Sequence, residues 1–209
     1  MPRPRSLTPE GIAAAALVVI DRAGLAALSM RTVAAELGTG TMSLYRYVKH
    51  REQLERLVVD LVLSTIDLAL PAGSSWTERA TLLVERIRDA VSAHPAVVPL
   101  FLTHRHTSVS VMRCGEALLG VLTDAGFTGR QRVIAFRTLL AYLVGALTAE
   151  DLGPLSGPGT VALSELPTTA YPLLAQTASV ARDIPSDEEF RGGLAAVLRG
   201  LDPAQGGRE

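Results

Sequence analysis

Side chains able to bind a nucleic acid are concentrated between residues 29 and 49. They carry hydroxyl, guanidinium, ammonium, phenol and thioether groups, and they are Ser29, Arg31, Thr41, Met42, Ser43, Tyr45, Arg46, Tyr47 and Lys49. Arg46 can give paired hydrogen bonds to a guanine edge, and Met42 offers apolar contact to a thymine methyl group. Thr41 and Ser43 can contact bases or phosphates. The segment therefore predicts a DNA-binding surface with Arg46 as its main base-reading side chain.

The other members of this set suit phosphate contacts, which position a protein on DNA without reading its sequence. Tyr45, Tyr47 and Lys49 would lie at the rim of the contact. Ser29 stands at an expected helix start, where free backbone N–H groups attract phosphate, and Arg31 could reach a base or a phosphate from the same helix.

Two short helices must position these side chains, and the sequence predicts a helix-turn-helix over about residues 29–48. The break between the helices is Gly38-Thr39-Gly40, and the second helix is expected over residues 42–48. Four aliphatic residues at helical spacing can hold the two helices together: Val33, Leu37, Leu44 and Val48. The alternative is an ordinary helical segment in which Tyr45 and Tyr47 are packing residues.

The charge distribution agrees with a DNA-binding N-terminal segment. The formal net charge is −1 for the whole chain, whereas residues 1–56 hold eight Arg and Lys residues against five Asp and Glu residues. A locally basic segment favours contact with phosphates, and Arg3 and Arg5 could form an arm that enters the minor groove.

The composition predicts an all-α protein. Hydrophobic residues make up 48% of the chain and aromatic residues only 4%, so that Ala, Leu and Val favour packed helices over sheets. Helical spacing predicts about ten helices, over about residues 9–23, 29–37, 42–48, 51–69, 76–93, 97–103, 107–124, 129–151, 171–181 and 187–201. Capping boxes are expected at Ser75–Glu78, Thr128–Gln131 and Ser186–Glu189. Glycines and prolines predict a flexible loop over residues 152–168.

The cellular compartment is expected to be the cytoplasm. The single cysteine, Cys114, allows no internal disulfide and fits a reducing environment. No apolar stretch approaches the ~18 residues needed to cross a membrane, so no membrane contact is expected.

A metal-responsive regulator remains an alternative because three histidines and the cysteine could ligate a metal: His94, His104, His106 and Cys114. No close ligand pair such as Cys-x-x-Cys supports it, so no metal or cofactor is expected. A helical enzyme or a helical adaptor without DNA binding is less favoured. The chain has no nucleophile elbow, no phosphate loop and no His-Glu-x-x-His, and no catalytic residue is expected.

The run Leu37-Gly-Thr-Gly-Thr-Met-Ser-Leu-Tyr-Arg-Tyr-Val-Lys-His-Arg-Glu-Gln-Leu54 resembles the DNA-binding segment of the tetracycline-repressor (TetR) family. The resemblance extends over residues 8–28 and continues weakly through Ser75-Trp76, residues 125–128 and residues 190–201. It implies a three-helix DNA-binding domain over residues 1–50 and a larger helical ligand-binding and dimerisation domain over residues 51–209. The helix at about 51–69 would connect them. Gly40 stands where relatives often carry a capping Ser or Thr, so a slightly frayed second helix is expected.

The resemblance further implies a homodimeric repressor that reads a palindromic operator in double-stranded DNA and is released by a small-molecule inducer. The dimer contact would be a four-helix bundle of the helices at about 129–151 and 187–201. Their apolar residues are Phe136, Leu140, Leu143, Val144, Leu147, Phe190, Leu194, Val197, Leu198 and Leu201. The alternative is that these residues face the core of their own subunit.

The inducer would lie in the C-terminal domain, around a possible hinge at residues 102–107. The candidate lining residues are Phe101, His104, Arg105, Met112, Cys114, Phe136 and Tyr142. Phe101 falls where the tetracycline-binding branch has a histidine that helps to hold magnesium. Because a phenyl ring cannot ligate a metal, tetracycline itself is not expected as the inducer.

Overall fold

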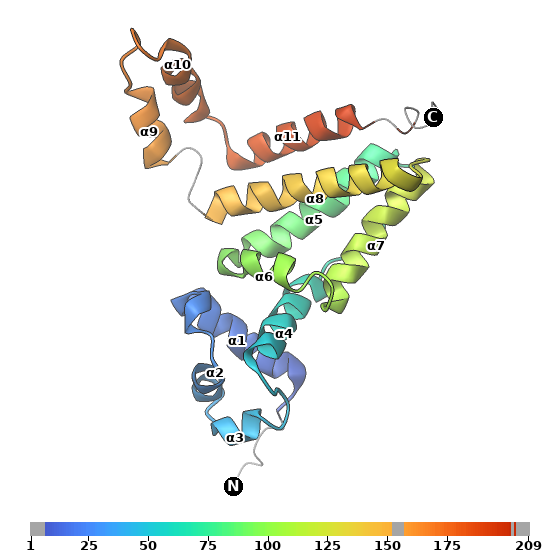
Figure 1. Cartoon of the computed structure of the whole chain (residues 1–209), viewed down its shortest axis with the longest axis vertical. Helices are drawn as coiled ribbons and strands as arrows, with labels where there is room; N and C mark the ends of the chain where they lie inside the picture. The colour runs from blue at the N-terminus through green and yellow to red at the C-terminus, as the bar shows by residue number, and fades with distance from the viewer. Residues whose placement is uncertain (1–6, 152–156, 202, 204–209) are drawn as a thin grey trace. The chain divides into compact units, whose positions relative to one another are not determined.

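The computed structural model describes residues 7–151, 157–201 and 203. Over these residues the chain forms eleven α-helices, two 3-10 helices and no strand, which confirms the all-α prediction (Figure 1). The elements are α1 (Pro9–Ala23), η1 (Leu25–Ala27), α2 (Met30–Glu36), α3 (Thr41–Leu44), α4 (Arg51–Ser64), α5 (Trp76–Ser92), η2 (Pro95–Val97), α6 (Val98–Thr103), α7 (Val109–Asp124), α8 (Gly129–Asp151), α9 (Pro158–Ser164), α10 (Pro172–Ala181) and α11 (Ser186–Gly200).

The chain divides into two compact units, each with its own contacts. The first comprises Met1–Ala72 and Glu85–Gly120, and the second comprises Gly73–Val84 and Val121–Glu209. The first unit therefore holds the predicted DNA-binding segment together with α4, α6 and most of α7. The functional boundary at residue 50 stays a prediction.

The core of the first unit lies between α1 and α4. Thr8 caps α1 by accepting a hydrogen bond from the Gly11 N–H at 3.1 Å, and Pro9 occupies the first turn, where a missing N–H costs nothing. The buried residues of α1 include Ile12 and Ile20, and those of α4 include Leu54 and Val58. α2 packs on α1, and α3 packs on α2.

In the second unit, an aromatic contact and a polar cap fix the start of α5. The rings of Trp76 and Phe127 meet edge to face, with centroids 5.2 Å apart. Ser75 and Glu78 form the expected capping box, with the Ser75 N–H donating to the Glu78 carboxylate at 2.7 Å and the Glu78 N–H donating to the Ser75 hydroxyl at 3.2 Å. These hydrogen bonds lower the pKa of the Glu78 carboxyl.

Tyr142 of α8 fixes the close approach of α11. Its hydroxyl donates to the Phe190 carbonyl at 2.7 Å, and its ring lies 5.5 Å from that of Phe190. A Cβ on Gly193 would meet the hydroxyl end of the Tyr142 side chain, so the glycine leaves room for Tyr142 in its present position.

Two predicted helices are shorter in the structure. α3 has α-helical geometry only over Thr41–Leu44, and the following residues form a tighter turn in which the Tyr47 N–H donates to the Leu44 carbonyl. α4 ends at Ser64 rather than at about residue 69. The carbonyls of Asp67 and Ala69 accept instead from Arg86 of α5, at 2.5 and 2.8 Å. A tertiary contact therefore satisfies the backbone carbonyls of the extended segment that follows α4.

The predicted loop over residues 152–168 is partly wrong, since α9 occupies Pro158–Ser164. Residues 152–156 lie outside the described residues. Gly157 supplies an extended cap and Pro158 takes the first helical position, where proline is tolerated. The expected cap at Ser186 is also wrong, because Pro185 holds the cap position and no side chain caps α11.

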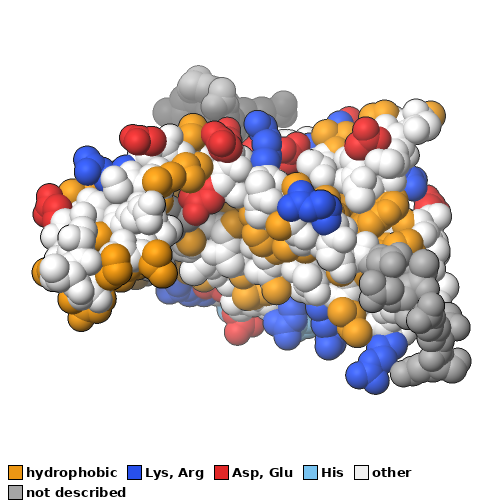
Figure 2. Space-filling view, turned by 90° about the horizontal axis from the view of Figure 1, so that it is seen from above, with side chains coloured by type: hydrophobic (Ala, Val, Ile, Leu, Met, Phe, Trp, Pro, Cys, Tyr) orange, Lys and Arg blue, Asp and Glu red, His pale blue; other side chains and the backbone are white. Residues whose placement is uncertain are grey.

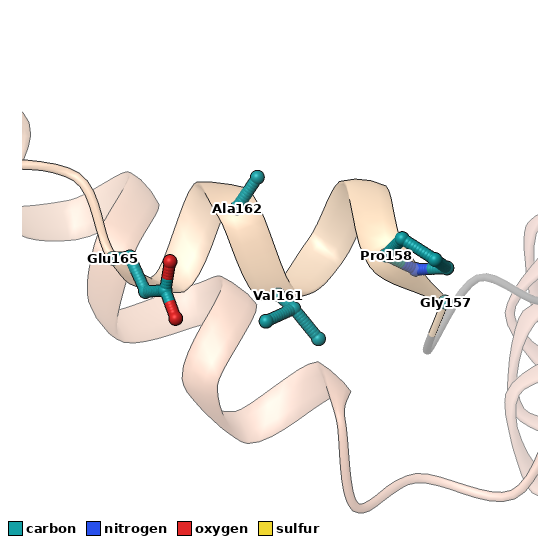
Figure 3. A pocket seen from close by; sticks show the side chains of 5 residues that line it. All are labelled: Gly157, Pro158, Val161, Ala162 and Glu165. Carbon is teal, nitrogen blue, oxygen red and sulfur yellow. The ribbon is translucent and has the colours of Figure 1, made fainter.

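α9 and α10 pack on each other and leave apolar side chains exposed, as Figure 2 shows at the left of the view. Leu173 is 76% exposed, and Val180 and Tyr171 are more than half exposed. The hollow beside α9 in Figure 3 is lined by Gly157, Pro158, Val161, Ala162 and Glu165.

We expect opposite effects of alanine at two glycines. Gly38 joins α2 to α3 with φ +63°, so Gly38→Ala should lower the free energy of unfolding by about 1 kcal/mol. Gly120 lies within α7 with open space around it, so Gly120→Ala should raise the free energy of unfolding by about 0.5–1 kcal/mol. Thermal and urea denaturation measure both. A Gly38→Ala protein at least as stable as the wild type would contradict the left-handed turn.

Candidate nucleic-acid interface

The start of α2 is fixed by a capping box between Ser29 and Thr32. The Thr32 N–H donates to the Ser29 hydroxyl at 3.1 Å, and the Ser29 N–H donates to the Thr32 hydroxyl at 3.0 Å. Thr32 also donates to the Ala27 carbonyl at 2.8 Å. The Ser29 hydroxyl is thus part of the cap itself. Thr32 was not predicted as part of the cap because the usual residue at this position of a capping box is Glu or Gln.

α3 is anchored by residues at its end and just after it. Leu44 is fully buried, Val48 is 1% exposed, and Val33 on α2 is fully buried. Leu37 is the C-cap of α2 and is only half-buried. The predicted aliphatic contact is thus made chiefly by Val33, Leu44 and Val48.

With this anchor buried, the predicted base-reading side chains face outward. Met42 is 78% exposed and Arg46 is also exposed, whereas Thr41 and Ser43 are half-buried. The Arg46 side chain makes no hydrogen bond or ion pair with the described part of the chain, and the same holds for the side chain of the exposed Arg31 on α2. Both guanidinium groups are available to an anionic partner.

The rim residues are also accessible. Tyr45 and Tyr47 are 42% and 45% exposed. The Lys49 ammonium donates to the Tyr45 carbonyl at 3.1 Å, in the turn that follows α3. The Lys49 N–H donates to the Gln53 side chain at 2.6 Å. Lys49 thus helps to terminate the segment. Arg3 and Arg5 lie outside the described residues.

The seven candidate inducer-binding residues do not share one environment. Phe101, His104, Arg105, Met112 and Cys114 belong to the first unit, whereas Phe136 and Tyr142 belong to the second. Arg105 is exposed and Met112 is 48% exposed, while Phe101 and Phe136 are half-buried. The hollow in Figure 3 is lined by none of the seven.

Two of the three histidines of the metal hypothesis have carboxylate partners instead. His94 Nδ1 lies 2.9 Å from Asp21 of α1, and His104 Nε2 lies 3.1 Å from Glu55 of α4. Burial raises the pKa of the Cys114 thiol, which makes the thiolate form that binds metals less accessible. Across residues 7–151 and 157–201 the structure places no three His, Cys, Asp or Glu side chains together as metal ligands.

The polar contacts on α4 were missed at the sequence level. Glu55 contacts His104 across 49 positions of sequence, and Asp60 accepts a hydrogen bond from the Ser108 hydroxyl at 2.6 Å. Neither pairing has a local sequence signal. The contacts also hold the predicted hinge at residues 102–107 against α4.

Both parts of the chain match models of known protein families. Residues 12–55 match the tetR family of bacterial regulatory proteins, and residues 70–204 match the tetracyclin repressor-like C-terminal domain. The second model alone covers more than half of the chain.

Individual relatives agree with these matches. The HTH-type transcriptional repressor DrrR1 of Streptomyces coeruleorubidus is 33% identical over 71% of this chain, which spans only 55% of that relative. The tetracycline repressor protein class D of Escherichia coli is 26% identical over 94% of this chain and 89% of its own. ActR of Streptomyces coelicolor in complex with actinorhodin has a TM-score of 0.82 and 26% identity, covering 98% of this chain and all of that chain. The chain belongs to the tetR family of bacterial regulatory proteins.

Proposed function

We propose that the chain is a transcriptional repressor that binds a palindromic operator in double-stranded DNA as a homodimer. One observation carries the proposal: a short helix anchored by Leu44 and Val48 presents Met42 and Arg46 to solvent. The major groove of B-form DNA admits one such helix, and arginine paired with guanine is the commonest base-specific contact. The bacterial chromosome lies in the cytoplasm, where the protein would act.

A small molecule would release the repressor. The support is by relationship, because one similar structure is ActR in complex with actinorhodin and another relative is named as a tetracycline repressor. Release requires that the molecule binds the DNA-incompetent conformation more tightly, since equal affinity for both conformations would shift nothing. Because the phenyl ring of Phe101 cannot ligate a metal, the inducer would be held without a metal ion at position 101.

The apolar surface of α8 supports a homodimer. Several residues of the predicted bundle, among them Leu143, Phe190 and Leu194, are buried within the subunit, so that part of the alternative interpretation is correct. A different stripe of α8 is exposed, with Ile134, Ala141 and Gly145 at helical spacing.

By length and composition α8 is apolar enough to cross a membrane, contrary to the sequence expectation. Only 22% of its apolar stretch is buried within the subunit, so packing in the subunit's own core does not account for the apolar character of α8. One such helix is weak evidence for a membrane span. A second subunit that covers the exposed stripe explains the same apolar surface, as expected for a helix at a subunit interface.

The proposal is tested first by a band-shift assay with DNA that flanks the gene of this protein, over a series of salt concentrations. We expect retardation of a fragment that contains a palindrome. The logarithm of the affinity should fall linearly with the logarithm of the salt concentration, because phosphate contacts release counterions. A protein that binds no duplex at low salt would refute the proposed function.

Arg46 and Lys49 should have different roles in operator binding. Arg46→Ala should weaken cognate binding by about 1–3 kcal/mol and relax the preference at one base position. Lys49→Ala should weaken cognate and unrelated duplexes alike. Fluorescence anisotropy with both duplexes measures this, and Arg113→Ala, which removes an exposed arginine from α7, is the control. Equal losses on all duplexes for Arg46→Ala would show that Arg46 does not read bases.

The cap of α3 can be improved. Gly40 has φ −77° and ψ 146°, no side-chain cap and open space at its Cβ. Gly40→Ser should therefore raise the free energy of unfolding by a few tenths of a kcal/mol, roughly 0.3, because a serine hydroxyl can accept a hydrogen bond from the free N–H groups of α3. Gly40→Ala, which adds a Cβ but no acceptor, should be less stable than wild type in the same denaturation experiment.

A charge on the exposed stripe of α8 should break the dimer. Ala141→Arg places a guanidinium at the centre of the proposed contact, and we expect a monomer by light scattering coupled to gel filtration. Ala14→Arg makes the same change at an exposed position of α1 and should remain dimeric. If Ala141→Arg kept the mass of a dimer, the contact would have to lie elsewhere.

A further inference from the structure

Glu55 of α4 is nearly buried and uses both carboxylate oxygens. Its Oε1 accepts a hydrogen bond from Arg51 Nε at 2.8 Å, and its Oε2 lies 3.1 Å from His104 Nε2. The side chain of Glu55 is 12% exposed and that of His104 is 8% exposed. Because a carboxylate removed from water depends on its donors, the positions of Arg51 and His104 are both fixed by the same group.

Arg51 extends this contact to the segment that precedes the helix-turn-helix. Its Nη2 donates to the Leu25 carbonyl at 3.0 Å, in the short element η1. η1 joins α1 to the capping box of α2, since Thr32 of that box donates to the Ala27 carbonyl. The position of η1 therefore affects how α2, and with it α3, is held.

His104 carries the other end of the chain of contacts, because it closes the turn between α6 and α7. Its carbonyl accepts from the N–H groups of Thr107 and Ser108 at 3.0 and 2.9 Å. The turn is held on α4 a second time by Asp60, which accepts from the Ser108 hydroxyl and from the Ser110 N–H at 2.6 and 3.0 Å. A displacement of this turn would thus act directly on the carboxylate of Glu55.

We propose that Glu55 is a positioning residue for operator binding, which couples the α6–α7 turn to the helix-turn-helix through His104, Arg51 and the Leu25 carbonyl. All four groups belong to the first compact unit, where α4 runs from the α1–α3 segment towards α6 (Figure 1). The inference rests on the proposed DNA-binding function. Its physical basis is that losing either donor leaves a nearly buried carboxylate with an unmet partner, so the two ends are not independent.

The test is a double-mutant cycle on operator affinity, measured by fluorescence anisotropy with the full chain. Arg51→Ala and His104→Ala remove the two donors separately, and the double variant removes both. We expect the effect of the double variant to differ from the product of the single effects by about fivefold, within the usual range of coupling between sites. In a Glu55→Gln background the same two substitutions should become multiplicative, because the shared charged acceptor is gone.

The matched control is Glu52→Gln, which removes the same charge from the same helix. The side chain of Glu52 is 82% exposed and lies 3.9 Å from His50, outside the chain of contacts. Glu52→Gln should leave the coupling between Arg51 and His104 unchanged. The proposal would be overturned if, without a change at Glu55, the loss of operator affinity in the double variant equalled the product of the losses in Arg51→Ala and His104→Ala.

A second measurement does not depend on DNA. Hydrogen–deuterium exchange should be faster at the amides of Ala27 and Leu28 in His104→Ala than in the wild type, because the His104 side chain acts on η1 through Glu55 and Arg51. Arg51→Ala should produce the same increase, and His104→Ala should add nothing to it. Unchanged exchange at these amides in a folded His104→Ala protein would overturn the inference, whereas failure to bind any duplex would refute only the proposed function.

Discussion

The helix-turn-helix depends on the burial of two aliphatic side chains, Leu44 at the end of the four-residue helix α3 and Val48 just after it. An isolated helix of this length is not stable in water, because nucleation is costly and few hydrogen bonds repay it. α3 therefore owes its order to packing against α2, where Val33 is also fully buried. Once the apolar side of the segment is buried, Met42 and Arg46 face solvent. The exposure of these two side chains therefore follows from the packing of the opposite side of the segment against α2.

α4 applies the same principle with polar groups. Its apolar face, including Leu54 and Val58, packs in the core with α1, while Glu55 and Asp60 bind the turn between α6 and α7. Carboxylates that are largely removed from water need fixed donors, so these contacts specify one position of the turn more strictly than apolar packing does. The helix that leaves the DNA-binding segment is thus joined to the rest of its unit by directional contacts.

The second unit contains a long apolar helix that its own subunit covers only in part. The inner face of α8 is closed by α11, where Tyr142 donates to the Phe190 carbonyl and Gly193 permits the close approach. The outer face exposes Ile134, Ala141 and Gly145. Sequence periodicity cannot separate these two faces, because both are apolar. Periodicity identified the helix correctly. The dimer bundle implied by the family resemblance included Leu143 and Phe190, which are buried within the subunit, as the alternative interpretation had it.

The sequence by itself determined the helical class, most helix starts and the helix-turn-helix, because caps, glycines and apolar spacing act over three or four residues. It also identified the family through the motif around Leu44-Tyr45. The tertiary structure alone decided where α3 and α4 end, that α9 forms beside α10, and that His94 and His104 pair with Asp21 and Glu55. The reason is physical. The end of α4 and the partner of each of these histidines depend on which donor or acceptor the fold brings near, and that group lies between 17 and 73 residues away in the chain.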